Sequence, residues 1–284
     1  MGPTNEPPSG AVDDPGELLT PPTPANRESR TALKNWATVM GHLMVQHLDS
    51  DTKAGRASLF FMLAEPLILI GLFYLIRGVA RGMVSQYGDS LFLFLASGIL
   101  PFYLFVRTST LTRRSQLRPG RRLPRINSMD LFMATTATNA LIWLVVIGFL
   151  FVGMWMYGIK QAIPVSIGDC GIALFLLVIA GGGLALIHSA IARYFPAWLA
   201  IIRYSTRGLL FFSGVIHIAD FYPPYLRTWL VWNPILHGVD WFRLGVYGRY
   251  PTLVLDEFYL VKTAVILLFI GIVADRATLR HGGR

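Results

Sequence analysis

The stretch IALFLLVIAGGGLALIHSAIA (residues 172–192) decides the fold class of this chain. It is apolar and long enough to cross the hydrocarbon core of a bilayer as a single helix. Other apolar stretches lie on both sides of it, at 59–76, 91–106, 131–157, 204–219 and 257–274. The sequence therefore predicts an all-α integral membrane protein with six transmembrane helices between residues 58 and 276.

The composition agrees with a lipid environment. Of 284 residues, 54% are hydrophobic and 14% are charged, and the mean hydropathy is +0.51, which is too apolar for a soluble domain of this length. The net charge of +9 comes from basic residues that flank the apolar stretches. This pattern favours the anionic inner leaflet over nucleic acid as the counter-charge. Cys170 is the only cysteine, which excludes an intramolecular disulfide and a cysteine metal cluster.

Basic residues crowd into every second connection and indicate an orientation. Most of the 25 Lys and Arg residues fall on the side that holds both termini. Basic connections stay on the cytoplasmic side of a membrane. Both termini are therefore expected in the cytoplasm. The basic residues left on the outer side are Arg77, Arg81, Lys160, Arg227, Arg243, Arg249 and Lys262.

The N-terminal region precedes the first predicted span. Residues 1–30 are rich in Pro, Gly and acidic residues and are expected to form a disordered cytoplasmic tail. No apolar core follows the initiator Met, so no cleavable signal peptide is expected. Residues 31–56 place apolar side chains three and four apart between basic residues, which predicts an amphipathic helix in the inner interface. A helix packed on protein would have the same pattern.

The segment 220–250 separates the fifth and sixth predicted spans. It is aromatic, interrupted by prolines and too polar for another crossing. It is expected to form one or two re-entrant half-helices in the outer leaflet. Such a break in the backbone is tolerated only where protein or a water-filled cavity covers it.

Few residues have the chemistry of an ion-coupled carrier or an enzyme. Glu65 is the only carboxylate well inside a predicted span, and next to Pro66 it is expected to bond a neighbouring helix or the freed backbone. The run Gly181–Gly183 has no following Lys-Ser or Lys-Thr, so close helix packing is its expected role. The histidine spacing indicates no metal site. No catalytic residues and no cofactor are therefore expected in this chain.

Three segments resemble the ABC-2 type permeases. AGRASLFFMLAEPLILIGLF (54–73) is similar to the start of their first span, and LASGILPFYLF (95–105) to their second. LFFSGVIHIADFYPPYLRTWLVWNPILHGVDWFRLGVYGRY (210–250) looks like the outer segment of the capsular polysaccharide exporters in its Pro-Pro, Trp-Asn-Pro and Trp-Phe-Arg motifs. The resemblance extends from about residue 31 to the C-terminus, and residues 31–284 are identified as one permease domain.

The resemblance implies half of a transporter in a bacterial inner membrane. Two copies would pair with two cytoplasmic ABC ATPase subunits, and with a periplasmic co-polymerase or adaptor protein, to export a lipid-linked capsular polysaccharide. The chain has no GxxxxGK[ST] motif, so ATP and Mg would be bound by the partner ATPase. O-antigen, teichoic acid, a lipid or a drug would be alternative substrates. A membrane enzyme or a structural protein is a more distant alternative.

The same resemblance assigns candidate residues for coupling to the ATPase. The loop Thr108–Asn127 is expected to dock the ATPase, although a positive-inside signal alone would account for its charge equally well. The loop residues expected to make this contact are Arg113, Arg114, Arg118, Arg121 and Arg122.

The conduit is expected between the two permease copies, where sugar rings would stack on aromatic side chains. Facing lipid is the common alternative for such aromatics, and reaching head groups is the alternative for the two arginines. The expected conduit residues are Tyr74, Phe102, Tyr103, Phe211, Phe212, Arg77 and Arg81. An outer gate that meets the periplasmic partner, or else an interfacial aromatic belt, is expected at Trp229, Trp232, Asn233, Trp241 and Arg243.

Overall fold

The computed structural model describes residues 56–281, apart from 83, 112–127 and 252. All described residues lie within one compact unit, and within this part of the chain the regular elements are all helices. The expected tail 1–30, the interface helix 31–56 except for its last residue, and most of the coupling loop lie outside the described residues. The prediction of an all-α protein is confirmed for the residues that the structure describes.

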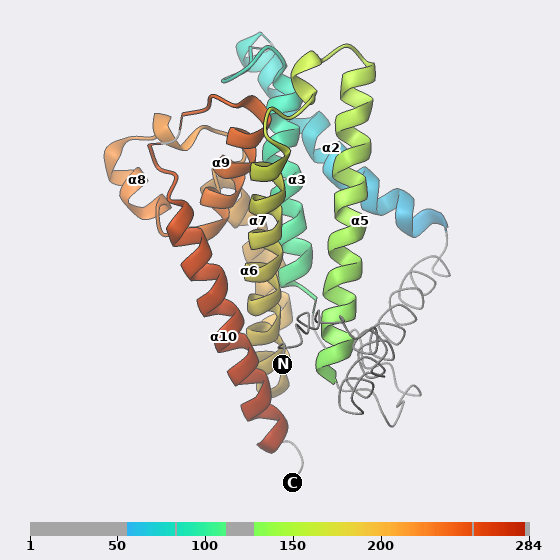
Figure 1. Cartoon of the computed structure of the whole chain (residues 1–284), viewed down its shortest axis with the longest axis vertical. Helices are drawn as coiled ribbons and strands as arrows, with labels where there is room; N and C mark the ends of the chain where they lie inside the picture. The colour runs from blue at the N-terminus through green and yellow to red at the C-terminus, as the bar shows by residue number, and fades with distance from the viewer. Residues whose placement is uncertain (1–55, 83, 112–127, 252, 282–284) are drawn as a thin grey trace, which may run out of the picture. The chain divides into compact units, whose positions relative to one another are not determined.

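Four of the described helices are long and apolar enough to cross a membrane. They are α3 (Leu91–Ser109), α5 (Ser128–Met156), α6 (Ile167–Tyr194) and α10 (Glu257–His281), which Figure 1 shows as the long helices of the bundle. They correspond to the second, third, fourth and sixth predicted spans. The count of six spans stays a prediction.

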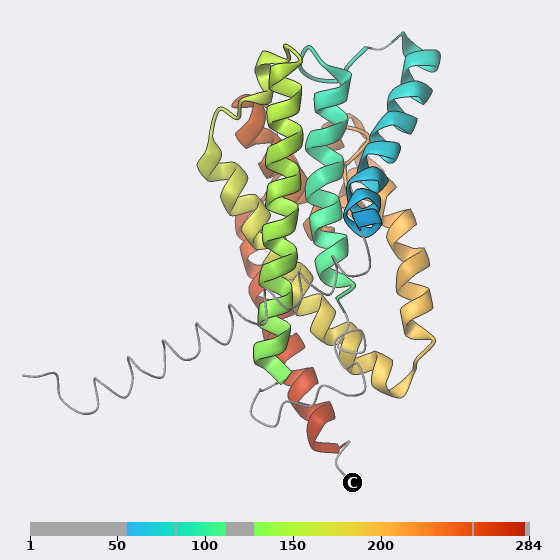
Figure 2. The ribbon, with the colours of Figure 1, turned by 90° about the vertical axis from the view of Figure 1, so that its right-hand side faces the viewer.

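The other two predicted spans correspond to helices of different lengths. The first lies in α2 (Arg56–Arg81), which is long enough to cross a membrane but is not among these four helices. The fifth overlaps α7 (Trp198–Phe212), which has 15 residues and ends before the apolar stretch does. In Figure 2, α7 rises on the right beside α2, and the rings of Phe73 and Phe211 lie 6.4 Å apart there.

The centre of the bundle is α6, which packs against α3, α9 and α10. A Cβ atom at Gly183 would collide with the α10 backbone at Leu267 and Leu268, and one at Gly271 would collide with the carbonyl oxygen of Gly183. Only glycine at these two positions lets the helices approach this closely. The close packing predicted for the run Gly181–Gly183 is therefore confirmed at Gly183.

The segment between α7 and α10 contains short helices. The η3 turn (Ala219–Phe221) leads into α8 (Pro224–Leu230) and α9 (Pro234–Tyr247). Each α-helix starts with a proline, as expected for the first turn. Asn233 caps α9 through the bond from the Ile235 N–H to its side-chain oxygen (3.0 Å). With 7 and 14 residues, both helices are too short to cross a bilayer, as predicted.

One end of the bundle gathers the connections 84–90 and 157–166 and the segments 213–251 and 253–256; we call it the loop end (Figures 1 and 2). Gln161 donates to the carboxylate of Asp89 (2.7 Å) and accepts from its N–H (3.0 Å). The N–H of Ser166 donates to the carbonyl of Gly245 (2.9 Å). These bonds join connections that are far apart in sequence, so the loop end is a packed structure.

Candidate functional site

A polar interior site lies at residues 213–218, where the chain leaves α7; we call this segment the clamped turn. Here the backbone is not helical, and in a membrane protein its carbonyls need donors from elsewhere. Two arginines provide them. Arg243 donates to the carbonyls of Gly214 (2.7 Å) and Val215 (2.6 Å), and Arg77 donates to that of Ile216 (2.6 Å). Three consecutive carbonyls are thus held by side chains from α9 and α2.

Arg243 is fully buried and is the centre of this arrangement. Its guanidinium also donates to the Tyr250 hydroxyl (3.1 Å) and to the Phe94 carbonyl (3.3 Å). Its Cζ lies 4.2 Å from the centroid of the Phe94 ring, within the range of a cation–π contact. Gly98 makes room on α3, because a Cβ there would collide with the guanidinium. A buried charge needs such a set of partners.

Two amide side chains complete the bonding of the clamped turn. Asn233 donates to the Phe212 carbonyl (3.0 Å) and to the Ser213 hydroxyl (2.9 Å). Gln86 accepts from the N–H of Ile218 (3.1 Å). Gly214 turns the chain at a φ of 66°, which glycine adopts without strain. The turn is therefore fixed by α2, α9 and the connection after α2.

His237 ties the short helices to α10. Its Nδ1 accepts from the N–H of Asp256 (3.0 Å), so this nitrogen carries no proton. The proton is then on Nε2, which donates to the carbonyl of Val231 (2.8 Å). Burial lowers the pKa of His237, against the opposing effects of the Val231 bond and Asp256, and keeps the ring neutral.

Asp240 is a second buried ionisable group of α9 that sequence analysis did not single out. It is 1% exposed, and its Oδ1 has no hydrogen-bond partner among the described residues. Burial raises the pKa of Asp240 to about 7, Arg243 opposes this shift and Asp220 adds to it. Asp240 precedes Arg243 by three residues on a helix that starts at Pro234. This spacing is the sequence signal that the two side chains are neighbours on one face of the helix.

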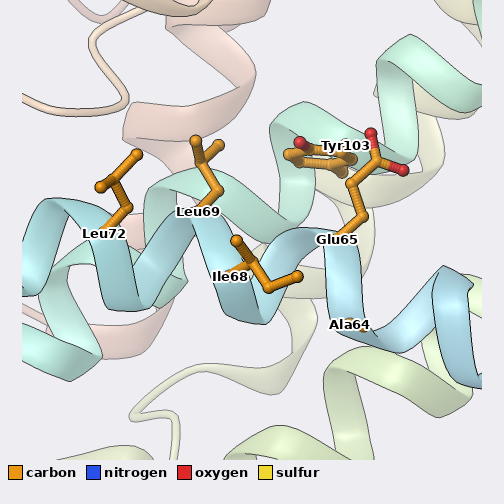
Figure 3. Close-up of a pocket in the computed structure, with 6 residues that line it drawn as sticks. All are labelled: Ala64, Glu65, Ile68, Leu69, Leu72 and Tyr103. Carbon is orange, nitrogen blue, oxygen red and sulfur yellow. The ribbon is translucent and has the colours of Figure 1, made fainter.

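A groove of about 430 Å³ lies on the face of α2 and α3 and is lined mainly by apolar side chains (Figure 3). Glu65 is at one end, beside the ring of Tyr103 (Figure 3). The Glu65 carboxylate forms an ion pair with Arg107 of α3, and both side chains are nearly half exposed. Glu65 thus bonds a neighbouring helix, while Pro66 is buried. Tyr103 in turn stacks on Trp143 of α5, with centroids 5.9 Å apart.

The expected conduit aromatics do not converge within one chain. Tyr103 lines the α2–α3 groove, whereas Phe102 is 3% exposed and belongs to the core. Tyr74 packs against Phe92, with ring centroids 6.2 Å apart. Phe211 and Phe212 are exposed on α7. Of the two expected conduit arginines, Arg77 is buried against the clamped turn. The side chain of Arg81 lies outside the described residues.

The expected gate residues separate into two groups. Trp229 and Trp232 are exposed, whereas Trp241 and Arg243 are buried and Asn233 is partly buried. In this conformation the buried pair cannot touch a partner protein. The expected coupling residues Arg113, Arg114, Arg118, Arg121 and Arg122 lie outside the described residues.

Comparison with known proteins gives several relatives, although no protein-family model matches the chain. The polysialic acid transport protein KpsM of Escherichia coli is 27% identical over 236 residues, which are 79% of this chain and 88% of the relative. A second Escherichia coli protein of that name is 26% identical over 64% of this chain and 71% of its own length. The capsule polysaccharide export inner-membrane protein BexB of Haemophilus influenzae is 31% identical over 36% and 38%. The predicted resemblance is confirmed.

Proposed function

We propose that this chain, which is homologous to capsule polysaccharide export inner-membrane proteins, is the permease subunit of an ABC transporter that exports a capsular polysaccharide. The observation that carries this proposal is the match to the polysialic acid transport protein over 79% of the chain and 88% of the relative. The four apolar helices agree with it, because they belong to a membrane protein.

A transporter of this kind needs a motor and a second permease copy. The chain contains no GxxxxGK[ST] motif, so two cytoplasmic ATPase subunits supply the energy, with ATP and Mg bound there. They dock on the basic loop 108–127, and both termini lie in the cytoplasm. A periplasmic co-polymerase or adaptor protein receives the polymer at the loop end.

The polymer passes between two copies of the chain. The described helices enclose a close-packed core, and the α2–α3 groove opens on the surface instead. Tyr103 in this groove and the exposed Phe211 and Phe212 on α7 offer ring faces to the C–H faces of sugars. The short helices α8 and α9 are re-entrant in the outer leaflet. Arg77 and Arg243 supply hydrogen bonds there to the non-helical carbonyls of the clamped turn.

A deletion strain tests the function. Deletion of the gene removes surface capsule and leaves O-antigen intact, and a plasmid copy restores the capsule. Loss of O-antigen with normal capsule would instead assign the chain to a different polymer. Purification in mild detergent recovers an ABC ATPase with the chain, and its absence would contradict the ABC transporter proposal.

Charge reversal in the loop tests the coupling surface. Arg113→Glu with Arg114→Glu abolishes export and ATPase recovery, while membrane insertion stays normal because the other basic connections are unchanged. The matched control is Arg203→Glu with Arg207→Glu, two exposed arginines of α7 on the same expected side. Undiminished ATPase recovery with normal export in the loop variant would contradict docking at this loop.

A further inference from the structure

The ion pair between Glu65 and Arg107 joins α2 to the end of α3 that leads into the basic loop 108–127. Arg107 lies in the last turn of α3, and the loop follows it directly. Glu65 reaches this turn from α2, with the ring of Tyr103 beside it (Figure 3). Arg107 is therefore close in sequence to the loop arginines expected to contact the ATPase, but its guanidinium is bonded within the permease.

The same end of α3 is fixed to α5, the helix that follows the loop. Asn139 of α5 donates to the Thr108 hydroxyl (3.0 Å), and both side chains are buried. One turn further along α5, Trp143 stacks on Tyr103. Buried polar contacts of this kind hold neighbouring helices together in a membrane. The helices at the two ends of the loop are thus joined to each other, so a force on the loop acts on both.

The helix α2 is attached through two charged side chains. Glu65 bonds α3, and Arg77 donates to the Ile216 carbonyl of the clamped turn (2.6 Å). The two attachments are about 18 Å apart along the helix axis. Pro66 lies inside α2 next to Glu65, where its ring removes a backbone hydrogen bond and allows a bend. The position of the start of α2 therefore depends on the partner of Glu65.

The position of α2 matters because of the surface that this helix presents. Apolar side chains follow one another along α2 at the spacing of one helical face. They are at least half exposed and comprise Ile68, Leu72, Leu75 and Val79. The α2–α3 groove with Tyr103 begins at the first of them. A displacement of α2 therefore moves a part of the chain that is proposed to face the conduit.

We propose that the Glu65–Arg107 ion pair transmits the movement of the ATPase-bound loop to α2. The inference rests on the proposed function and adds to it the element that carries motion from the loop into the membrane. Separation of the pair would leave a carboxylate without a partner inside the first predicted span, which is costly in lipid. For this reason α2 moves with α3 when the ATPase displaces the loop. Glu65 and Arg107 act as positioning residues in this role.

Two other roles for the pair give different results. A pair that only holds α2 on α3 would affect the amount and the Tm of the protein, and would leave the export per ATP hydrolysed unchanged. An Arg107 that contacts the ATPase would behave like Arg113 and Arg114, whose reversal removes the ATPase from the complex. A transmitting pair changes the export per ATP hydrolysed while the ATPase stays bound.

The test uses the permease with its ATPase partner. Capsule export is measured in cells per molecule of permease, and ATP hydrolysis is measured in the complex purified in lipid nanodiscs. In Arg107→Gln we expect normal ATPase recovery and continued hydrolysis, but about tenfold less export per ATP hydrolysed, a typical size for coupling between two sites. Arg107→Lys keeps the charge and should retain most of the export. The matched control is Arg276→Gln, at an exposed arginine of α10, which should equal the wild type.

Reversal of the pair separates the bond from the individual side chains. Glu65→Arg alone places two guanidinium groups together and should lower the export per ATP hydrolysed. Adding Arg107→Glu restores the attraction between the two positions and should recover at least part of the export. No recovery in the reversed pair, at a normal amount of protein, would overturn the proposal.

Two results with Arg107→Gln would also overturn it. One is an export per ATP hydrolysed equal to that of the Arg276→Gln control. The other is loss of the ATPase from the complex, because Arg107 would then be part of the docking surface. If the wild-type complex contains the ATPase and exports capsule in either case, the inference fails and the proposed function stands. A wild-type complex without an ATPase would instead contradict the proposed function itself.

Discussion

The guanidinium of Arg243 on α9 lies over the ring of Phe94 on α3, with Cζ 4.2 Å from the ring centroid. The same guanidinium bonds the clamped turn through the carbonyls of Gly214 and Val215. One side chain therefore joins three segments that are far apart in sequence. Its removal affects all of them at once.

Arg243→Met should destabilise the protein by several kcal/mol, since each buried carbonyl left without a donor costs about 1–3 kcal/mol. Thermal unfolding in detergent measures the effect as a lower Tm. Arg243→Lys should be intermediate, because one ammonium cannot reproduce the fork of a guanidinium. Arg249→Met, at an exposed arginine nearby, is the control and should leave the Tm unchanged. Equal Tm values for the two methionine variants would contradict the claim that Arg243 stabilises the clamped turn.

Gly183→Ala should separate α6 from α10. The added Cβ collides with the α10 backbone, which cannot move away as a side chain could, so we expect a loss of about 1–3 kcal/mol. Gly171→Ala on the same helix is the control, because a Cβ there meets nothing within 4 Å. Protease resistance of the purified protein compares the two. A Gly183→Ala protein as resistant as the control would exclude close packing here.

His237 should make the loop end less stable in acid. Its pKa is lowered in the folded protein, so between the unfolded value of about 6.5 and the folded value the unfolded chain binds the extra proton. Stability contributed by the neutral ring is present above about pH 6.5 and is lost as the pH falls below it. Unfolding in denaturant at several pH values measures this slope.

The pH experiment needs a background without Asp240, whose pKa is raised to about 7. A raised carboxyl pKa acts in the opposite direction, because its contribution is lost as the pH rises from about 4 towards 7. In Asp240→Asn protein the acid loss should appear alone, and adding His237→Gln should abolish it. An acid slope that persists in the double variant would assign it to another group.

Phe102 and Tyr103 should respond differently to alanine. Phe102 is 3% exposed in the core, so Phe102→Ala should cost about 3–5 kcal/mol and reduce the amount of protein in the membrane. Tyr103 lines the α2–α3 groove, and Tyr103→Ala should reduce capsule export per molecule of protein. Immunoblots of membranes and a capsule assay separate the two effects. Normal export per molecule in Tyr103→Ala would remove this residue from the conduit.

Local patterns in the sequence were sufficient for much of the fold. The apolar run of α6, its three glycines and the proline at the start of α9 each depend on neighbours a few residues away. The fifth predicted span extends to residue 219 because Val215, Ile216 and Ile218 continue the apolar run. Instead Gly214 turns the chain, and these side chains are buried in the clamped turn.

The interior role of Arg243 was not predictable from the sequence. An arginine in a polar, proline-containing connection has the appearance of a surface residue, and its partners Phe94 and Gly214 are distant in sequence. Only the assembled helices bring them together. The same holds for Glu65, whose ionic partner Arg107 lies on another helix, 42 residues further along the chain.

Both ring nitrogens of His237 are engaged by main-chain atoms, one before α9 and one before α10. The imidazole therefore links the end of α8 and the start of α10 to α9, on which His237 lies. A movement of α9 that keeps both bonds must therefore displace the end of α8 and the start of α10 with it, so these three segments are coupled through one side chain.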